Sequence, residues 1–347
     1  MNNAPRIGLA LGSGAAKGFA HIGVLKFLED MGIKPHVVAG TSMGAFVGAA
    51  YSAGYLDKLE DWVRLLDNWK VFSLLDINWT LSGGILGGKK PFKAFFDDFE
   101  FENIEDLPIP FTAVATDLHS GQEIWLQQGN LQDAVSASCS IPGLLSAKSL
   151  SGRWLVDGAV VNPVPVDVCR AMGATCVIAV DVTEDGAPLI QRQQAQVQKV
   201  VSETPREDDE ENSQAVSKTR AEAEAELLEP VPIEDQSNGV TFSRLLEQGK
   251  EQLTQLRGFR NRNRTVSPGM LDTMSQAMAI LERRHKRARM IGAPPDVLIM
   301  PKVGGIGGME FSRAAEAVDA GEAEARRLRT WIEDMVQNHQ QAGPRQT

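Results

Sequence analysis

Residues 37–46, VVAGTSMGAF, join an apolar run to a serine that stands between two glycines, Gly40 and Gly44. The apolar run predicts a β-strand, and the small residues at 43–54 predict a helix that packs closely on a sheet. Between a strand and a helix, a G-x-S-x-G turn holds the serine oxygen at the carboxyl end of the sheet, next to the helix amino terminus. Ser42 is therefore a candidate nucleophile. The alternative is a close-packed corner that carries no chemistry.

A second glycine turn lies upstream, in residues 7–18, IGLALGSGAAKG, between a predicted strand and a predicted helix. Two strand–glycine turn–helix units predict a doubly wound sheet of mainly parallel strands. The glycines Gly12, Gly14 and Gly18 are spaced G-x-G-x-x-x-G, and Gly40 stands where a dinucleotide-binding unit has an acidic residue. We therefore disfavour a nucleotide-binding oxidoreductase. We interpret the turn as a source of backbone N–H groups for an oxyanion.

The rest of the chain continues the alternation of strands and helices. Apolar runs bounded by turn residues predict strands at 110–118, 122–126, 153–157, 175–182 and 295–303. Helical periodicity predicts helices at 166–173, 272–290 and 310–336. The alternation is interrupted at 186–265, which is rich in Gln, Glu, Ser and Ala. We interpret this segment as an acidic low-complexity insert that is partly helical or disordered.

A serine hydroxyl needs a base, and Asp157 is placed to supply one. It ends the predicted strand 153–157, and Gly158 behind it allows a sharp turn, so its carboxylate is expected at the same sheet edge as Ser42. The alternative is an ordinary turn aspartate. The histidines stand in positions typical of surface or capping residues: His21, His36, His119, His285 and His339. Among them His119, in a predicted turn, is the least poor candidate for a histidine triad.

Charge and cysteine content limit the classes of function and of compartment. The net charge is −10, and residues 200–240 hold twelve acidic and three basic residues, which account for −9 of it. This balance argues against nucleic acid as a partner. Three cysteines without C-x-x-C spacing are typical of a reducing compartment, and we see neither a secretory signal nor a long apolar run. We expect a cytoplasmic protein, with peripheral contact at the inner face of the membrane as an alternative.

In several segments the chain resembles a known family, the patatin-like phospholipases, and within it the bacterial cytoplasmic branch. These segments stand in the family's order and cover most of residues 5–185 and 268–335. The resemblance implies a three-layer α/β/α fold with a mainly parallel central sheet, hydrolysis of lipid esters, and no metal or cofactor. It rests on IGLALGSGAAKGFAHIGVLKFLE (7–29), VVAGTSMGAFVGAAYSAG (37–54), ASCSIPGLL (137–145), LVDGAVVNPVPVDVCRAMGATCVIAVDV (155–182) and ERRHKRARMIGAPPDVLIMPKV (282–303).

The resemblance also implies roles for individual residues. Ser42 would be the nucleophile and Asp157 its base, in a Ser–Asp dyad. Backbone N–H groups of Ser13, Gly14 and Ala15 would form the oxyanion hole, with Lys17 at the family's basic position. The residues that support these motifs are Gly12, Lys17, Gly18, Gly40, Gly44, Gly158 and Ala159.

The chain departs from the family at two places. Ser13, Gly14 and Ala15 replace three frequent consecutive glycines, and Ala159 replaces the second glycine of a frequent Asp-Gly-Gly. An alanine still offers its N–H group, provided that its φ is negative or that the strain of a positive φ is tolerated. The identity of the oxyanion donors therefore depends on the backbone conformation of this turn.

We predict one discontinuous catalytic domain at 5–185 and 266–336, the insert at 186–265, and a disordered tail at 337–347. The expected function is hydrolysis of a lipid ester or phospholipid by Ser42 and Asp157. The rival is a non-catalytic or weakly active regulatory or scaffold protein on the same fold, which binds a protein partner through the acidic insert. Membrane contact is an alternative to ordinary packing for the Trp-rich stretch 56–79, and to a solvated face for the basic stretches 257–264 and 283–289.

Overall fold

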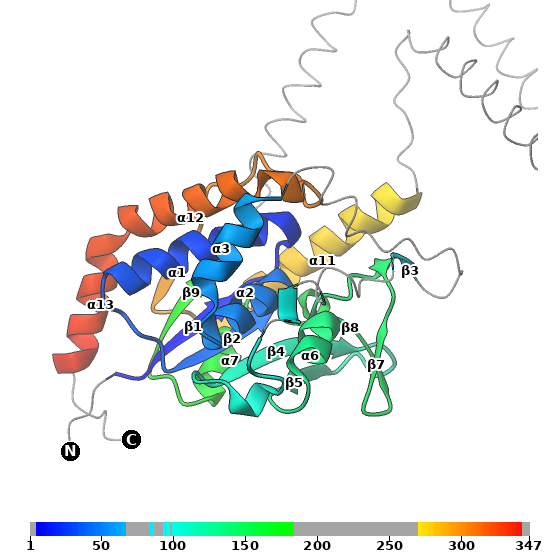
Figure 1. Ribbon diagram of the computed structural model, residues 1–347, viewed down its shortest axis with the longest axis horizontal. Coiled ribbons are helices and arrows are strands. Elements are labelled where there is room, and N and C mark those ends of the chain that lie inside the picture. Colours follow the sequence, from blue (N-terminus) through cyan, green and yellow to red (C-terminus); the bar gives the residue numbers. More distant parts are fainter. Residues whose placement is uncertain are drawn as a thin grey trace, which may run out of the picture. The chain divides into compact units, whose positions relative to one another are not determined.

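The computed structural model describes residues 5–66, 84–86, 93, 95–97, 99–183 and 270–341. They belong to one compact unit, shown in Figure 1. The predicted insert at 186–265 lies outside the described residues, as do its basic stretch 257–264, Trp69 and Trp79, and the final residues 342–347. The predicted domain boundaries therefore remain predictions.

A central sheet is formed by strands in the order β10-β9-β1-β2-β4-β8-β7, with β5 paired to β4. Its parallel part consists of β1 (Ile7–Leu11), β2 (Val37–Thr41), β4 (Phe111–Asp117), β9 (Cys176–Val180) and β10 (Val297–Ile299). Antiparallel strands extend it beyond β4: β5 (Glu123–Leu126), β8 (Arg153–Asp157) and β7 (Lys148–Leu150). A separate parallel pair joins β3 (Gly84–Leu86) to β6 (Gly143–Leu145).

Helices cover both faces of this sheet (Figure 1). One apolar core includes side chains from α1 (Ala20–Asp30), α2 (Met43–Ser52), α3 (Leu56–Arg64), α6 (Leu131–Ser138), α12 (Ala314–Arg327) and α13 (Arg329–Gln341). The core on the opposite face is completed by α7 (Val166–Ala171) and α11 (Met270–Gly292). Side chains of β1 alternate between the two: Leu9 and Leu11 enter the first core, and Ala10 the second. The predicted three-layer α/β/α fold with a mainly parallel central sheet is confirmed.

Short 3-10 helices connect several of these elements. They are η1 (Ala15–Phe19), η2 (Ile104–Asp106), η3 (Gly158–Val160) and η4 (Phe311–Arg313). Two of them lie at the predicted catalytic motifs: η3 directly follows β8, and η1 follows β1 after three residues, 12–14. Because β8 runs antiparallel to β4, its carboxyl end does not belong to the carboxyl edge of the parallel strands, which corrects the expected reason for its position. Asp157 lies near Ser42 because it pairs with Ala115, one position beyond the pair of Val114 with Thr41.

The helices α1 and α12 approach each other closely through two glycines. A Cβ atom on Gly23 would lie 2.0 Å from the carbonyl oxygen of Val318, and one on Gly321 would lie 1.9 Å from that of Ala20. Real side chains do not tolerate such distances, so both positions require glycine. This contact holds the carboxyl-terminal part of the chain against the helix that follows the first glycine turn.

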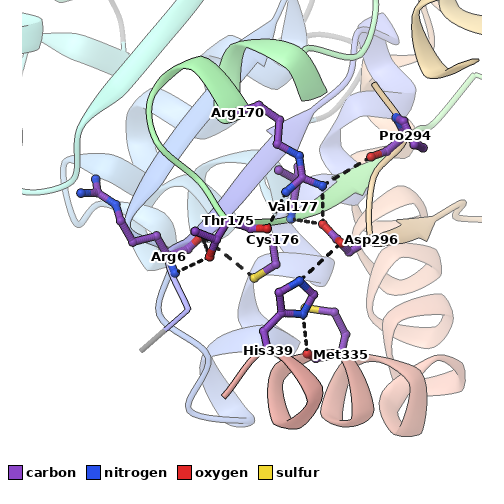
Figure 2. A network of polar contacts seen from close by, with 9 residues as sticks. All are labelled: Arg6, Arg170, Thr175, Cys176, Val177, Pro294, Asp296, Met335 and His339. Atoms are coloured by element: carbon purple, nitrogen blue, oxygen red, sulfur yellow. Dashed lines mark hydrogen bonds and ion pairs between the residues drawn. The ribbon is translucent and has the colours of Figure 1, made fainter. Parts of the chain in front are cut away.

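Figure 2 shows a polar network at the amino ends of β9 and β10, where segments from before and after the insert meet. The carboxylate of Asp296 accepts hydrogen bonds from the N–H group of Val177 at 2.7 Å and from the guanidinium of Arg170 at 2.6 Å. The other oxygen of this carboxylate lies 3.6 Å from Nε2 of His339 in α13. Together with the pairing of β9 and β10, these contacts join the two segments in one sheet.

The carboxyl-terminal region differs from the sequence-based prediction in two respects. The single helix expected at 310–336 is divided into η4, α12 and α13, and the last two are separated at Leu328. The second helix continues to Gln341, so residues 337–341 of the tail predicted to be disordered are helical. The physical reason is tertiary: Ile332 and Met335 of α13 enter the core, and His339 contacts Asp296.

Trp62 is the described tryptophan of the Trp-rich stretch. Its ring centroid lies 5.5 Å from that of Phe95 and 6.4 Å from that of Phe46, and the side chain packs against the first core. For Trp62 the structure thus favours ordinary packing over membrane contact. Among the described helices, none is long and apolar enough to cross a bilayer.

Candidate active site

Ser42 lies on a sharp turn between β2 and α2, with φ 57° and ψ −123°. Residues other than glycine seldom adopt this backbone conformation, and such strain is typical of nucleophile turns. The flanking glycines make the turn sterically feasible. A Cβ on Gly40 would lie 2.4 Å from the carbonyl oxygen of Gly44, and a Cβ on Gly44 would lie 2.1 Å from that of Leu11. Both glycines are therefore required, as the motif predicted.

The hydroxyl of Ser42 faces the carboxylate of Asp157. Ser42 Oγ donates to Asp157 Oδ2 at 2.6 Å, and the second carboxylate oxygen accepts a hydrogen bond from the N–H group of Ala159 at 2.8 Å. Asp157 is only 3% exposed. A Cβ on Gly158 would lie 2.2 Å from the carbonyl oxygen of Val114, so a glycine is needed for the backbone to approach β4 this closely. The two predicted dyad residues thus lie in direct contact.

The environment of Asp157 makes its carboxylate a stronger base than an exposed one. Burial raises its pKa to about 7, opposed by the hydrogen bonds from Ser42 and Ala159, while the nearby charge of Glu282 raises it further. A carboxylate with a pKa close to the working pH is suited to accept a proton from a hydroxyl.

The glycine turn between β1 and η1 packs directly against the Ser42 turn. A Cβ on Gly18 would lie 2.4 Å from Cγ of Met43, and Gly44 would clash with the carbonyl oxygen of Gly12 if it carried a side chain. The first residue of this turn is bound to β9: the N–H group of Gly12 donates to the carbonyl oxygen of Val180 at 2.9 Å. The predicted proximity of the two glycine turns is therefore present.

The three predicted oxyanion donors are not equivalent in this structure. The N–H group of Ser13 donates to the carbonyl oxygen of Pro163 at 2.9 Å. This hydrogen bond contradicts the predicted role of Ser13 as an oxyanion donor. Within the part of the chain that the structure describes, the N–H groups of Gly14 and Ala15 have no hydrogen-bond acceptor. Ala15 has φ 48°, so the strain of a positive φ is tolerated at this alanine.

Residues 9–170 match the model of the family described as "Patatin-like phospholipase". The chain contains a patatin-like phospholipase domain. An uncharacterised NTE family protein of Mycobacterium tuberculosis is 42% identical over 179 residues, which are 52% of this chain and 49% of that protein. "Neuropathy target esterase sws" of Drosophila melanogaster is 34% identical over 183 residues, 51% of this chain and 13% of that one.

The chain spans about half the length of the mycobacterial relatives and less of the animal ones. Human "Patatin-like phospholipase domain-containing protein 6" is 33% identical over 183 residues, 51% of this chain and 13% of that protein. Among solved structures, VipD from Legionella pneumophila aligns with a TM-score of 0.40 and 13% identity, over 96% of this chain and 66% of that chain.

The five histidines of the chain lie away from the dyad, and all of them belong to the described residues. None of them hydrogen-bonds to Ser42 or Asp157. His21 is fully buried, which corrects the expectation of a surface or capping role. Its Nε2 contacts the carbonyl oxygen of Gly12 at 2.7 Å, and burial lowers its pKa to about 4, so the ring stays neutral at pH 7. His285 contacts the carbonyl oxygen of Val160 at 2.7 Å, and His119 is exposed.

Residues 138–140 of the patatin-like domain border the dyad, although the sequence analysis assigned them no role. Ser138 Oγ accepts a hydrogen bond from the N–H group of Ser42 at 2.9 Å and donates to Val114. The thiol of Cys139 is buried beside the dyad, and burial together with the charge of Asp157 raises its pKa well above the usual range. The carbonyl oxygen of Ser140 accepts from the N–H group of Asp157. The signal in the sequence was the quoted stretch ASCSIPGLL.

One face of the basic stretch 283–289 is an interface with the sheet, while Arg284 and Arg287 are exposed. Lys286 is 2% exposed and its Nζ lies 2.6 Å from Oδ2 of Asp181, which is also 2% exposed. Arg289 forms ion pairs with Glu123 and Asp167. With His285 and Glu282, these residues stand at the spacing i, i+3, i+4, i+7, so they share one face of α11. Sequence reasoning missed this because a charged stripe gives no apolar periodicity.

Proposed function

We propose that this protein is a serine acyl hydrolase that cleaves lipid ester bonds. The observation that carries the proposal is the 2.6 Å hydrogen bond between Ser42 Oγ and Asp157 Oδ2, on a strained turn at a helix amino terminus. The names of the relatives, an esterase and a phospholipase-domain protein, support lipid esters as the substrate class. Phospholipid is one member of that class.

In the proposed reaction, Asp157 accepts the proton of Ser42 as Oγ attacks the ester carbonyl. The N–H groups of Gly14 and Ala15 would stabilise the negative oxygen of the tetrahedral intermediate. Collapse of this intermediate breaks the ester C–O bond, and Asp157 returns the proton to the departing alcohol. Water, deprotonated by Asp157, then attacks the acyl-enzyme; the bond between the acyl carbon and Ser42 Oγ breaks, Asp157 returns the proton to Oγ, and the fatty acid is released. Among the described residues, no cluster of three or more acidic, histidine or cysteine side chains is arranged to hold a metal.

The departures from the family's glycines are compatible with this reaction. Ala15 holds the positive φ that glycine would adopt and keeps its N–H group. Ala159 uses its N–H group to orient Asp157, which an alanine does as well as a glycine. These two positions therefore lend no support to the non-catalytic alternative.

The proposal is tested with a fluorophosphonate probe and a short-chain ester. The wild-type protein is expected to be labelled once per chain and to hydrolyse the ester, whereas Ser42→Ala is expected to do neither. The variant should keep the thermal midpoint within a few degrees, because only one hydroxyl is removed. A protein that is neither labelled nor active would support a regulatory or scaffold role, with the acidic insert as the surface to test for a partner.

A further inference from the structure

The oxyanion turn carries one polar side chain, and a residue from a distant segment binds it. In Gly12-Ser13-Gly14-Ala15 only Ser13 has a hydroxyl. This hydroxyl donates to Oε1 of Glu282 in α11, a residue 269 positions further along the chain. Ser13 is 3% exposed, so the contact is shielded from solvent.

Glu282 is itself held by the helix that carries it. One turn further along α11, Lys286 binds Asp181, and its Nζ also donates to the carbonyl oxygen of Thr183 at 2.9 Å. His285 contacts η3 directly behind Asp157, through the carbonyl oxygen of Val160. Since η3 and the oxyanion turn both touch α11, the helix bridges the two halves of the candidate active site.

We propose that Glu282 is a positioning residue for the reaction: by accepting the Ser13 hydroxyl it fixes the turn whose Gly14 and Ala15 N–H groups bind the oxyanion. The inference rests on the proposed hydrolase function. A turn that contains an alanine at positive φ has other conformations within reach, so a fixed side chain next to it keeps the N–H groups in place. Glu282 acts through Ser13 and does not touch the substrate.

The charge of Glu282 has a second effect, on the base. It raises the pKa of Asp157, so removal of the charge should lower that pKa. The groups that face Asp157 are Ser42, the N–H group of Ala159, the Cys139 thiol and Glu282. The groups that face Glu282 are Ser13, Asp181, Lys286, Lys17 and Asp157.

The experiment compares Glu282→Ala, Glu282→Gln and Ser13→Ala with the double variant Ser13→Ala/Glu282→Ala. The substrate is a short-chain ester, and titration with the fluorophosphonate probe gives kcat per active site. Glu282→Ala and Ser13→Ala should each lower kcat about tenfold with little change in KM, less than the loss of a whole oxyanion donor. The double variant should lose no more than either single one, because both remove the same contact.

Glu282→Gln separates the two effects. Its amide oxygen still accepts the Ser13 hydroxyl, so kcat at high pH should stay within about twofold of wild type, while the acidic limb of kcat/KM moves to lower pH. Arg284→Ala, an exposed position on the same helix, is the matched control and should leave kcat and the pH profile unchanged.

Additive losses in the double variant, a change confined to KM, or an unchanged kcat in Glu282→Ala would overturn the inference. A purely structural role would lower the thermal midpoint and the fraction of probe-titratable sites, with kcat per site unchanged, and would also overturn it. These outcomes differ from a failure of the proposed hydrolase function, in which the wild-type protein itself would be neither labelled by the probe nor active on the ester.

Discussion

Asp157 combines a buried carboxylate with two hydrogen bonds, and its pKa of about 7 determines when it can act as a base. Only the ionised form accepts the proton of Ser42. We therefore expect kcat/KM to be constant above about pH 8 and to fall as the pH drops through 7, by about tenfold per unit below it. Asp157→Asn should lower the rate by at least about a thousandfold at every pH, since an amide does not accept the proton.

The matched control for this prediction is His119→Ala, which removes the sequence-based triad candidate. His119 is exposed and is not hydrogen-bonded to the dyad, so its loss should leave most of the rate and the whole pH profile intact. A pH–rate profile measured from pH 5 to 9 for both variants decides the matter. If His119→Ala were as inactive as Asp157→Asn, a triad would have to replace the dyad.

At the scale of secondary-structure elements, local patterns predicted most of the positions that meet in the structure. The bounds of the strand 153–157 were predicted to the residue, and both glycine turns were predicted. These features depend on residues that are close in the sequence. The break at Leu328 was not predicted, and the strand predicted at 295–303 is shorter in the structure, Val297–Ile299, because both features depend on packing between distant segments. Glu282 was missed for the same reason: its partner Ser13 lies in another segment.

The contact between α1 and α12 gives a prediction at this scale. Gly321→Ala places a methyl group where the carbonyl oxygen of Ala20 stands, so the helices must separate. Overpacking costs about 1–3 kcal/mol, and a contact of 1.9 Å with a backbone atom belongs to the upper part of that range, so the cost exceeds the gain of about 1 kcal/mol from replacing glycine by alanine within a helix. Gly292→Ala in α11 is the matched control, because nothing lies within 4 Å of its added Cβ.

Urea denaturation of the two glycine variants measures the difference. Gly321→Ala should lower the unfolding midpoint, whereas Gly292→Ala should leave it unchanged or raise it slightly. Equal midpoints for Gly321→Ala and wild type would show that α12 can move away from α1 without cost, and that the close approach is not needed for stability.

At the scale of the whole molecule, the central sheet contains strands from two stretches of the chain. β9 precedes the acidic insert and β10 follows it, and the two strands pair in parallel from Ile178 to Val180. Asp296 and Lys286, both from the second stretch, bind Arg170 and Asp181 from the first. The sheet and both cores are therefore assembled from residues on either side of the insert, whereas the dyad residues Ser42 and Asp157 both precede it.

This arrangement predicts that the insert can be removed. Replacing residues 190–260 by a short flexible linker should leave a folded protein that is labelled at Ser42 and retains most of the ester hydrolysis. Because the entropy of loop closure grows slowly with length, the free energy of unfolding should change by only about 1 kcal/mol. The measurements are thermal unfolding and the ester assay, with limited proteolysis of the full chain as a parallel test. Its first cleavages are expected between residues 190 and 260, and the nicked protein should remain active. An aggregated deletion variant, or first cleavage elsewhere, would mean that the acidic insert stabilises the catalytic domain through contacts of its own.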